Sequence, residues 1–288
     1  MTVAAATTAA SGRRAHIIDV LIEERAPTLS SSRAWPLIRP PLYGLLHYRK
    51  ARRMADHIGP LPGAAALEHV AGQLALKVET YGLDRVPPHG RLILIANHPT
   101  GIADGIALYD AVRTRRPDIC FYANSDAHRV CGQLDDVLIP VEWLEAKRTR
   151  ERTRLTLQQT RAAMEAERAL AIFPSGRLAR RTPDGALADP PWMTSALSIA
   201  RKYETPVIPV HVTGPWSTLF HLFNRFSSEL RDITLFHELL NKRGRKFALI
   251  FGPPIPPDAF DADAGRATLA LKAYVERVLP NERDRPFA

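Results

Sequence analysis

The sequence lacks several features that would place it in a class at once. It has two cysteines among 288 residues, Cys120 and Cys131, which excludes a disulfide framework or a multi-cysteine zinc site and favours a reducing compartment. No apolar run reaches the ~18 residues that a membrane-spanning helix needs. Residues 1–15 have no charged segment ahead of their Ala/Thr-rich stretch, so we expect a flexible tail and not a signal peptide.

Motifs of nucleotide and zinc chemistry are also absent, since the sequence contains no Walker loop, Gly-x-Gly-x-x-Gly or His-Glu-x-x-His. What is present is an ordinary globular composition, 45% hydrophobic and 24% charged, which excludes collagen-like, coiled-coil and wholly disordered chains. The formal charge of +9 predicts an anionic partner: nucleic acid, membrane headgroups or a phosphorylated substrate. Only charge favours nucleic acid, because aromatic residues make up 7% and no RNP-like or helix-turn-helix pattern occurs, so we expect no nucleic-acid partner.

Short apolar segments alternate with helical segments along most of the chain. This alternation predicts an α/β domain, over residues 81–288, with a sheet covered by helices on both faces. Residues 16–80 are predicted to form an N-terminal helical element that includes a helix over residues 64–79. The expected strands cover residues 92–96, 119–123, 137–141, 170–173, 207–212 and 247–251. The main expected helices cover 148–168, 193–203, 264–278, a stretch after residue 103, and two stretches between 217 and 241.

The most informative stretch is RLILIANHPTGIADGIAL, residues 91–108, in which an apolar strand runs directly into His98 and then Asp104. Strand ends of α/β sheets are where ligands bind. A histidine there can act as a general base, and a nearby carboxylate can fix its tautomer. For these two residues alone the plainer alternative is a turn histidine and a helix N-cap aspartate.

The second stretch is ALAIFPSGRLARR, residues 169–181, where another apolar strand ends in a Pro-Ser-Gly turn followed by arginines. Backbone N–H groups of such a turn and the guanidinium groups of Arg177 and Arg180 suit a phosphate. Taken alone, these arginines are as readily a solvated surface. The sequence around Ser175 is not Gly-x-Ser-x-Gly, which argues against a nucleophilic serine.

Several blocks in order resemble the lysophospholipid (glycerolipid) acyltransferase family. VETYGLDRVPPHGRLILIANHPTGIADG is similar to the family's opening block with its His and Asp, and FPSGR resembles its Phe-Pro-Glu-Gly-type block. PVIPVHVTG resembles a later strand block, and SELRDITLFHELLNKRGRKFALIFGPPIP is similar to the hemolysin-like, ornithine-lipid branch. The resemblance runs from about residue 78 to residue 257 and implies a single mixed sheet flanked by helices.

The sequence departs from the family pattern at two places. The usual spacing places four residues between His and Asp, whereas five lie between His98 and Asp104. An extra residue inside a helix would swing Asp104 by ~100°, but in a loop Gly101 can absorb it by adopting a conformation closed to other residues. The usual acidic residue of the Phe-Pro block is Ser175 here.

The resemblance implies transfer of a fatty acyl group from acyl-CoA or acyl-ACP, as co-substrate, to a hydroxyl of a lysolipid resembling lysophosphatidic acid or lyso-ornithine lipid. His98 and Asp104 would be the catalytic residues, with no metal and no further cofactor. The residues implied in substrate binding are Asn97, Gly101, Pro174, Ser175, Gly176, Arg177 and Arg180. The alternatives are a non-catalytic lipid or membrane-surface binding protein on the same fold and, within the enzyme class, thioester hydrolysis.

A lysolipid acceptor implies peripheral contact with an anionic membrane, and we expect a cytoplasmic protein on the inner face of the cell membrane. Residues 35–58 are the predicted anchor. The apolar residues expected to enter the interface are Trp35, Leu37, Leu42, Tyr43, Leu45 and Leu46, with Arg49, Lys50, Arg52 and Arg53 at the headgroups. The alternative is that the leucines pack on the α/β domain and the basic residues are only solvated.

Overall fold

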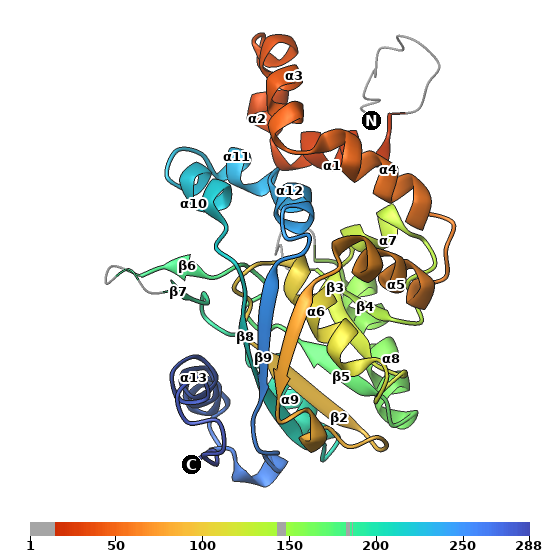
Figure 1. Cartoon of the computed structure of the whole chain (residues 1–288). Coiled ribbons are helices and arrows are strands. Elements are labelled where there is room, and N and C mark those ends of the chain that lie inside the picture. The colour runs from red at the N-terminus through yellow and green to blue at the C-terminus, as the bar shows by residue number, and fades with distance from the viewer. Residues whose placement is uncertain (1–14, 143–147, 183–184, 186) are drawn as a thin grey trace, which may run out of the picture.

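The computed structural model in Figure 1 describes residues 15–142, 148–182, 185 and 187–288, so nearly all of the predicted tail lies outside the described residues. Within them the central sheet has seven strands in the order β1-β9-β8-β2-β5-β3-β4. The strands are β1 (Lys77–Tyr81), β2 (Leu92–Ala96), β3 (Cys120–Asn124), β4 (Leu138–Val141), β5 (Ala169–Ile172), β8 (Val207–Thr213) and β9 (Lys246–Phe251). Neighbours are parallel except β8 and β9, so the predicted mixed α/β sheet is confirmed.

Helices cover both faces of the sheet because its central strand is apolar on both sides. In β2, Leu92 and Leu94 belong to the hydrophobic core under α5 and α6, whereas Ile93 and Ile95 belong to the core under α8, α9 and α13. The helices of this domain are α6 (Ile102–Val112), α7 (Asp126–Val130), α8 (Arg150–Glu165), α9 (Ser195–Lys202), α10 (Thr218–Asn224), α11 (Ser228–Asp232), α12 (Leu235–Leu240) and α13 (Ala264–Ala273), which continues as a π-helical turn (Tyr274–Val278). Two 3₁₀ turns (Leu83–Arg85, Pro257–Ala259) and a hairpin of β6 (Arg180–Arg181) and β7 (Leu187–Ala188) complete it.

The N-terminal segment is helical, as expected, and gathers at one end of the sheet beside α10, α11 and α12 (Figure 1). Its helices are α1 (Ile17–Arg25), α2 (Pro27–Ser30), α3 (Trp35–Leu45), α4 (Tyr48–Ile58) and α5 (Gly63–Leu74). A separate apolar cluster joins α1 to α4 with Ile233 and with the partly buried Leu219, Phe223, Leu230 and Phe236, whereas α5 packs in the core on the sheet.

The predicted helix over residues 64–79 is wrong in its last five residues. Helix α5 ends at Leu74, Ala75 takes a left-handed conformation with φ 43°, and β1 follows as an edge strand parallel to β9. The sequence of β1, KVETY, gave no strand signal because the strand has one neighbour and no fully buried residue.

Only some of the apolar residues that were predicted to enter the membrane interface are exposed. Trp35, Leu42, Tyr43 and Leu46 are buried in the cluster with α10 to α12, so they cannot enter a membrane in this conformation. Leu37 and Leu45 remain exposed, at 80% and 50%. No helix of the described residues is both long and apolar enough to cross a bilayer.

Candidate active site

The candidate site begins where β2 ends. All five residues of β2 are buried, and the chain then turns through residues 97–101 before α6 starts at Ile102. The side chain of Asn97 fastens this turn to β8, since its Nδ2 donates to the carbonyl of Val212 (3.0 Å) and its Oδ1 accepts from the Val212 N–H (2.6 Å). Both polar atoms of Asn97 are therefore occupied by the main chain of β8.

His98 and Asp104 lie side by side in this turn. Nδ1 of His98 is 3.0 Å from Oδ2 of Asp104, and the Asp104 side chain is fully buried while 16% of the His98 side chain is exposed. The angles at Nδ1 do not meet those of a hydrogen bond, although the distance does. The contact between Nδ1 and Oδ2 is therefore at ion-pair distance but is not a hydrogen bond in this structure.

The Asp104 carboxylate is held by the turn that it faces. Oδ2 accepts the main-chain N–H groups of Thr100 (2.8 Å) and Gly101 (3.0 Å), and Oδ1 accepts the Thr100 hydroxyl (2.5 Å). The orientation of Asp104 is therefore fixed before any substrate binds.

Gly101 absorbs the extra residue between His98 and Asp104, as the sequence predicted. Its φ of 88° and ψ of −142° lie in a region that is essentially restricted to glycine. A Cβ atom here would also come within 3.1 Å of Cδ1 of Leu178. The unusual spacing is thus accommodated in the loop, and α6 starts with Asp104 in its first turn.

The predicted Pro-Ser-Gly turn after β5 packs against His98. The ring of Phe173 lies 4.5 Å from the His98 imidazole, centroid to centroid, and the N–H of Ala179 donates to the His98 carbonyl (2.9 Å). Within the turn, the Ser175 hydroxyl donates to the Arg177 carbonyl (2.9 Å) and Gly176 has φ 58°. The Pro174 carbonyl accepts from the N–H of Met193 (3.0 Å).

The arginines that follow this turn are exposed. Among the described residues, the guanidinium groups of Arg177 and Arg180 have no hydrogen-bonded or ion-paired partner. Partial burial, and then the nearby charges of Arg231 and Arg177, lower the pKa of Arg180. Arg180 thus lies near Arg177 and near Arg231, which pairs with Asp232 (2.6 Å), and the exposed guanidinium groups of Arg177 and Arg180 suit an anionic ligand.

Sequence reasoning missed two buried residues beneath His98. Both carboxylate oxygens of Asp189 accept the main-chain N–H of His98, at 3.0 and 3.1 Å, and Oδ2 also accepts the indole N–H of Trp192 at 2.9 Å. Burial is the main cause that raises the pKa of Asp189 to about 6. Their signal in the sequence is the DPPW run, which follows an uninformative hairpin.

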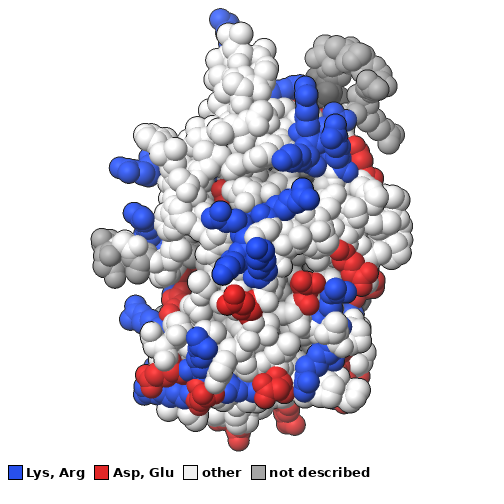
Figure 2. All heavy atoms as spheres, in the orientation of Figure 1, with Lys and Arg blue, Asp and Glu red and all other residues white. Residues whose placement is uncertain are grey.

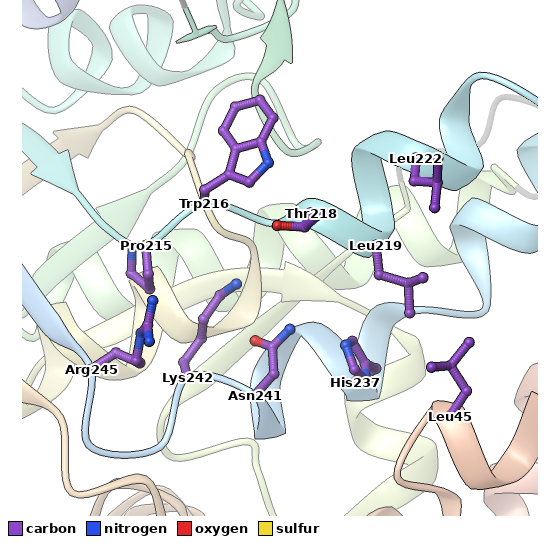
Figure 3. A pocket seen from close by; sticks show the side chains of 10 residues that line it. All are labelled: Leu45, Pro215, Trp216, Thr218, Leu219, Leu222, His237, Asn241, Lys242 and Arg245. Carbon is purple, nitrogen blue, oxygen red and sulfur yellow. The ribbon is translucent and has the colours of Figure 1, made fainter.

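A groove of about 330 Å³ is lined by residues of α3, of α10 and of the segment between α12 and β9, and is shown in Figure 3. Lys242, Asn241 and Arg245 lie toward one end of it, and Leu219, Leu222 and Leu45 toward the other. The remaining lining residues are Pro215, Trp216, Thr218 and His237. Gly214 precedes the lining residue Pro215 and lies close to the His98 turn. A Cβ atom at Gly214 would lie 2.5 Å from Cγ2 of Thr100.

In the described part of the chain, no group of three or more His, Cys, Asp or Glu residues is placed to hold a metal ion. The groups that the site does bring together are His98, the carboxylate of Asp104 and the exposed Arg177 and Arg180.

Comparisons with known proteins identify several proteins to which this chain is similar. Residues 77–213 match the family model described as Acyltransferase. A lyso-glycine lipid O-acyltransferase of Phocaeicola vulgatus is 27% identical over 206 residues, which are 69% of this chain and 71% of that protein. The protein of the same name from Bacteroides thetaiotaomicron is 25% identical over 205 residues, covering 69% and 73%. The crystal structure of the 1-acyl-sn-glycerophosphate acyltransferase PlsC from Thermotoga maritima aligns with a TM-score of 0.48 and 18% identity, over 77% of this chain and 81% of that one.

Proposed function

Because this chain belongs to the glycerolipid acyltransferase family and is an O-acyltransferase, we propose that it transfers a fatty acyl group from a thioester to a hydroxyl group of a lysolipid. The donor is a thioester of coenzyme A or of acyl carrier protein. The acceptor is an anionic lysolipid, such as a lyso-glycine, lyso-ornithine or lysophosphatidic acid type. The observation that carries the proposal is the His98–Asp104 pair at the end of a buried strand.

In this mechanism His98 is the general base. Its Nδ1 is buried against Asp104, so Nε2 takes the proton from the acceptor hydroxyl. The acceptor oxygen then forms a bond to the thioester carbonyl carbon, and the carbon–sulfur bond breaks. The thiolate leaves with the proton from Nε2, which regenerates neutral His98 and yields an ester and a free thiol. Asp104 keeps the productive tautomer and stabilises the imidazolium.

Substrate binding is assigned to the loops around this pair. Arg177 and Arg180 hold the anionic headgroup, which supplies the counter-ion that these side chains lack in the described residues. Asn97 and Gly101 shape the His98 turn, and the turn of Pro174, Ser175 and Gly176 forms the opposite wall next to His98. The leucine end of the groove in Figure 3 accommodates an alkyl chain of the acceptor.

A reaction panel tests the proposal. Purified protein is incubated with acyl-CoA or acyl-ACP and with each of the three lysolipid types, and products are identified by mass spectrometry. We expect a diacylated product with at least one donor–acceptor pair. Release of free fatty acid without an acylated lipid would establish a thioester hydrolase. No turnover with any pair, together with retained lipid binding, would favour the non-catalytic alternative.

We further propose that the protein works at an anionic membrane surface on the cytoplasmic side. Figure 2 shows Lys and Arg side chains concentrated in the upper half of one face, around α4, with acidic side chains mainly in the lower half. The four basic residues of α4 are Arg49, Lys50, Arg52 and Arg53, and all are exposed. Exposed Leu37 and Leu45 on the adjoining helix α3 supply the apolar contact.

Co-sedimentation with phosphatidylglycerol vesicles tests this surface. Binding should fall as salt is raised, and should fall at least about tenfold when the four basic residues of α4 are replaced by Ser. The matched control replaces four exposed arginines of α8 by Ser, namely Arg150, Arg152, Arg154 and Arg161. Equal losses in both variants would show that net charge alone, and not this surface, governs attachment.

A further inference from the structure

A second buried carboxylate contacts His98 at its main chain, whereas Asp104 lies at its ring. Asp189 is 6% exposed and accepts the main-chain N–H of His98 with both oxygens. The carbonyl of His98 is held by the N–H of Ala179 at 2.9 Å. The main chain of the base is thus fixed at both of its polar groups by the segment that follows β5.

Asp189 is itself fixed by a chain of charged contacts. Its own N–H donates to Oε1 of Glu276 at 2.7 Å, and Oε2 of Glu276 lies 2.5 Å from Nζ of Lys272. Trp192 donates its indole N–H to Oδ2 of Asp189. Through Asp189, these hydrogen bonds connect the π-helical turn after α13 with the end of β2, two segments that are far apart in the sequence.

The fold alone does not require a carboxylate at this position. A main-chain N–H and an indole N–H need only a neutral acceptor, and burying a charge costs free energy that a neutral acceptor would not. That cost is visible in the pKa of Asp189, which burial raises to about 6. Since that value lies below 7, the carboxylate is still mainly ionised at neutral pH, and its charge lies close to His98, whose main-chain N–H it accepts.

We propose that Asp189 is a positioning residue for acyl transfer: its carboxylate fixes the main chain of His98, and its charge stabilises the imidazolium that forms when His98 takes the acceptor's proton. This inference rests on the proposed role of His98 as the base. The cation would then lie between two carboxylates, Asp104 at Nδ1 and Asp189 at the main chain.

Other titratable groups surround this arrangement. Glu276 accepts the main-chain N–H of Asp189 and pairs with Lys272. The charge of Glu276 also acts on His211 of β8, and Arg177 belongs to the segment that packs beside His98. Since these groups remain in every variant below, a change between variants reports on Asp189.

The test is the pH profile of kcat/KM in Asp189→Asn. The asparagine oxygen still accepts the His98 N–H, but the negative charge is gone. We expect kcat at pH 8 to fall roughly tenfold. The midpoint of the acid limb should move to lower pH, because the imidazolium then has one nearby carboxylate, Asp104, in place of two. Circular dichroism melting of each variant reports whether the fold is retained.

The matched control is Asp118→Asn, which removes a carboxylate that pairs with the buried Arg116 away from the site. It should change melting but leave the acid limb in place. Asp189→Glu provides the second test if the asparagine variant does not fold. It retains the charge and displaces the oxygens by one methylene, so kcat should fall while the acid limb stays where the wild type has it.

Wild-type kcat and an unmoved acid limb in Asp189→Asn would overturn the proposal, as would full wild-type kcat in Asp189→Glu. Failure of this inference is distinguishable from failure of the proposed function. If His98→Ala retains acyl transfer, the proposed function fails. If His98→Ala is inactive while the Asp189 variants behave like Asp118→Asn, only the role of Asp189 fails.

Discussion

Two turns that follow neighbouring strands of the same sheet are built in opposite ways. The turn after β2 buries its polar side chains, with Asn97, Thr100 and Asp104 at 7%, 1% and 0% exposure. The turn after β5 buries Ser175 but exposes its cations, Arg177 and Arg180, without fixed partners among the described residues. Internal hydrogen bonds hold both turns, but the polar side chains of the first turn are satisfied within the protein, whereas the guanidinium groups of the second remain available to a ligand.

This difference indicates that the first turn carries the catalytic groups and the second binds the headgroup. A general base must lie within hydrogen-bond reach of the proton that it removes, and buried, fully satisfied partners hold it there. A headgroup site tolerates more freedom, because exposed guanidinium groups can adjust to the anion that they meet. Substitutions in the first turn should therefore lower kcat, and those in the second should raise the KM for the acceptor.

The largest effect should follow from His98→Ala. Removing the base should lower acyl transfer by about 10²–10⁴-fold, since that is what general-base catalysis typically contributes. Melting should change little, because 16% of the side chain is exposed and it fills a site wall and not the core. His89→Ala, an exposed histidine before Gly90, is the matched control and should keep full turnover. Comparable turnover in both variants would remove His98 from the chemistry.

Asp104→Asn should follow, with a loss of roughly 10²-fold in kcat. The amide retains the volume but cannot favour the imidazolium, and its NH₂ group faces the donors of Thr100 and Gly101. Steady-state kinetics with each substrate varied in turn measure the loss. An unchanged kcat would mean that the 3.0 Å contact between Asp104 and His98 has no catalytic consequence.

Gly101→Ala tests whether the buried turn depends on glycine. A side chain at φ 88° is strained and meets Leu178, so we expect about 1–3 kcal/mol less stability and a partial loss of kcat. Gly72→Ala is the control, because it lies inside α5 with open space around its Cα and should be neutral or stabilising. Urea denaturation of both variants decides between a general effect of added methyl groups and one specific to this turn.

Arg177→Ala should have the smallest effect on activity. Loss of one charge-assisted contact to the headgroup should raise the acceptor KM about tenfold and leave the donor KM and kcat nearly unchanged. Arg154→Ala, an exposed arginine of α8, controls for net charge. If the acceptor KM is the same in both variants, Arg177 belongs to the solvated surface.

The first turn was largely predictable from sequence, because an apolar strand that ends in polar residues marks a ligand-binding edge. The strain at Gly101 was predictable for a similar reason, since the His98–Asp104 spacing required a conformation that glycine permits. Asp189 was not, because it reaches His98 across 91 residues and the hairpin before it carries no pattern. Long-range hydrogen bonds leave no periodic signal.

The N-terminal segment shows the same limit of prediction from sequence, here for apolar residues. Leu42 and Leu46 were expected at a membrane because they share a face with no partner nearby in the sequence. Their partners are on α10 to α12, some 180 residues further on by the numbering of Leu219 and Leu230. An apolar face identifies burial, but only the tertiary fold identifies what buries it.

The most direct test of the contrast between the two turns is a side-by-side measurement of kcat and acceptor KM in Asp104→Asn and Arg177→Ala. The account predicts that kcat falls roughly 10²-fold in the first variant with little change in acceptor KM, and that acceptor KM rises about tenfold in the second with little change in kcat. It would be contradicted if both substitutions altered the same kinetic parameter.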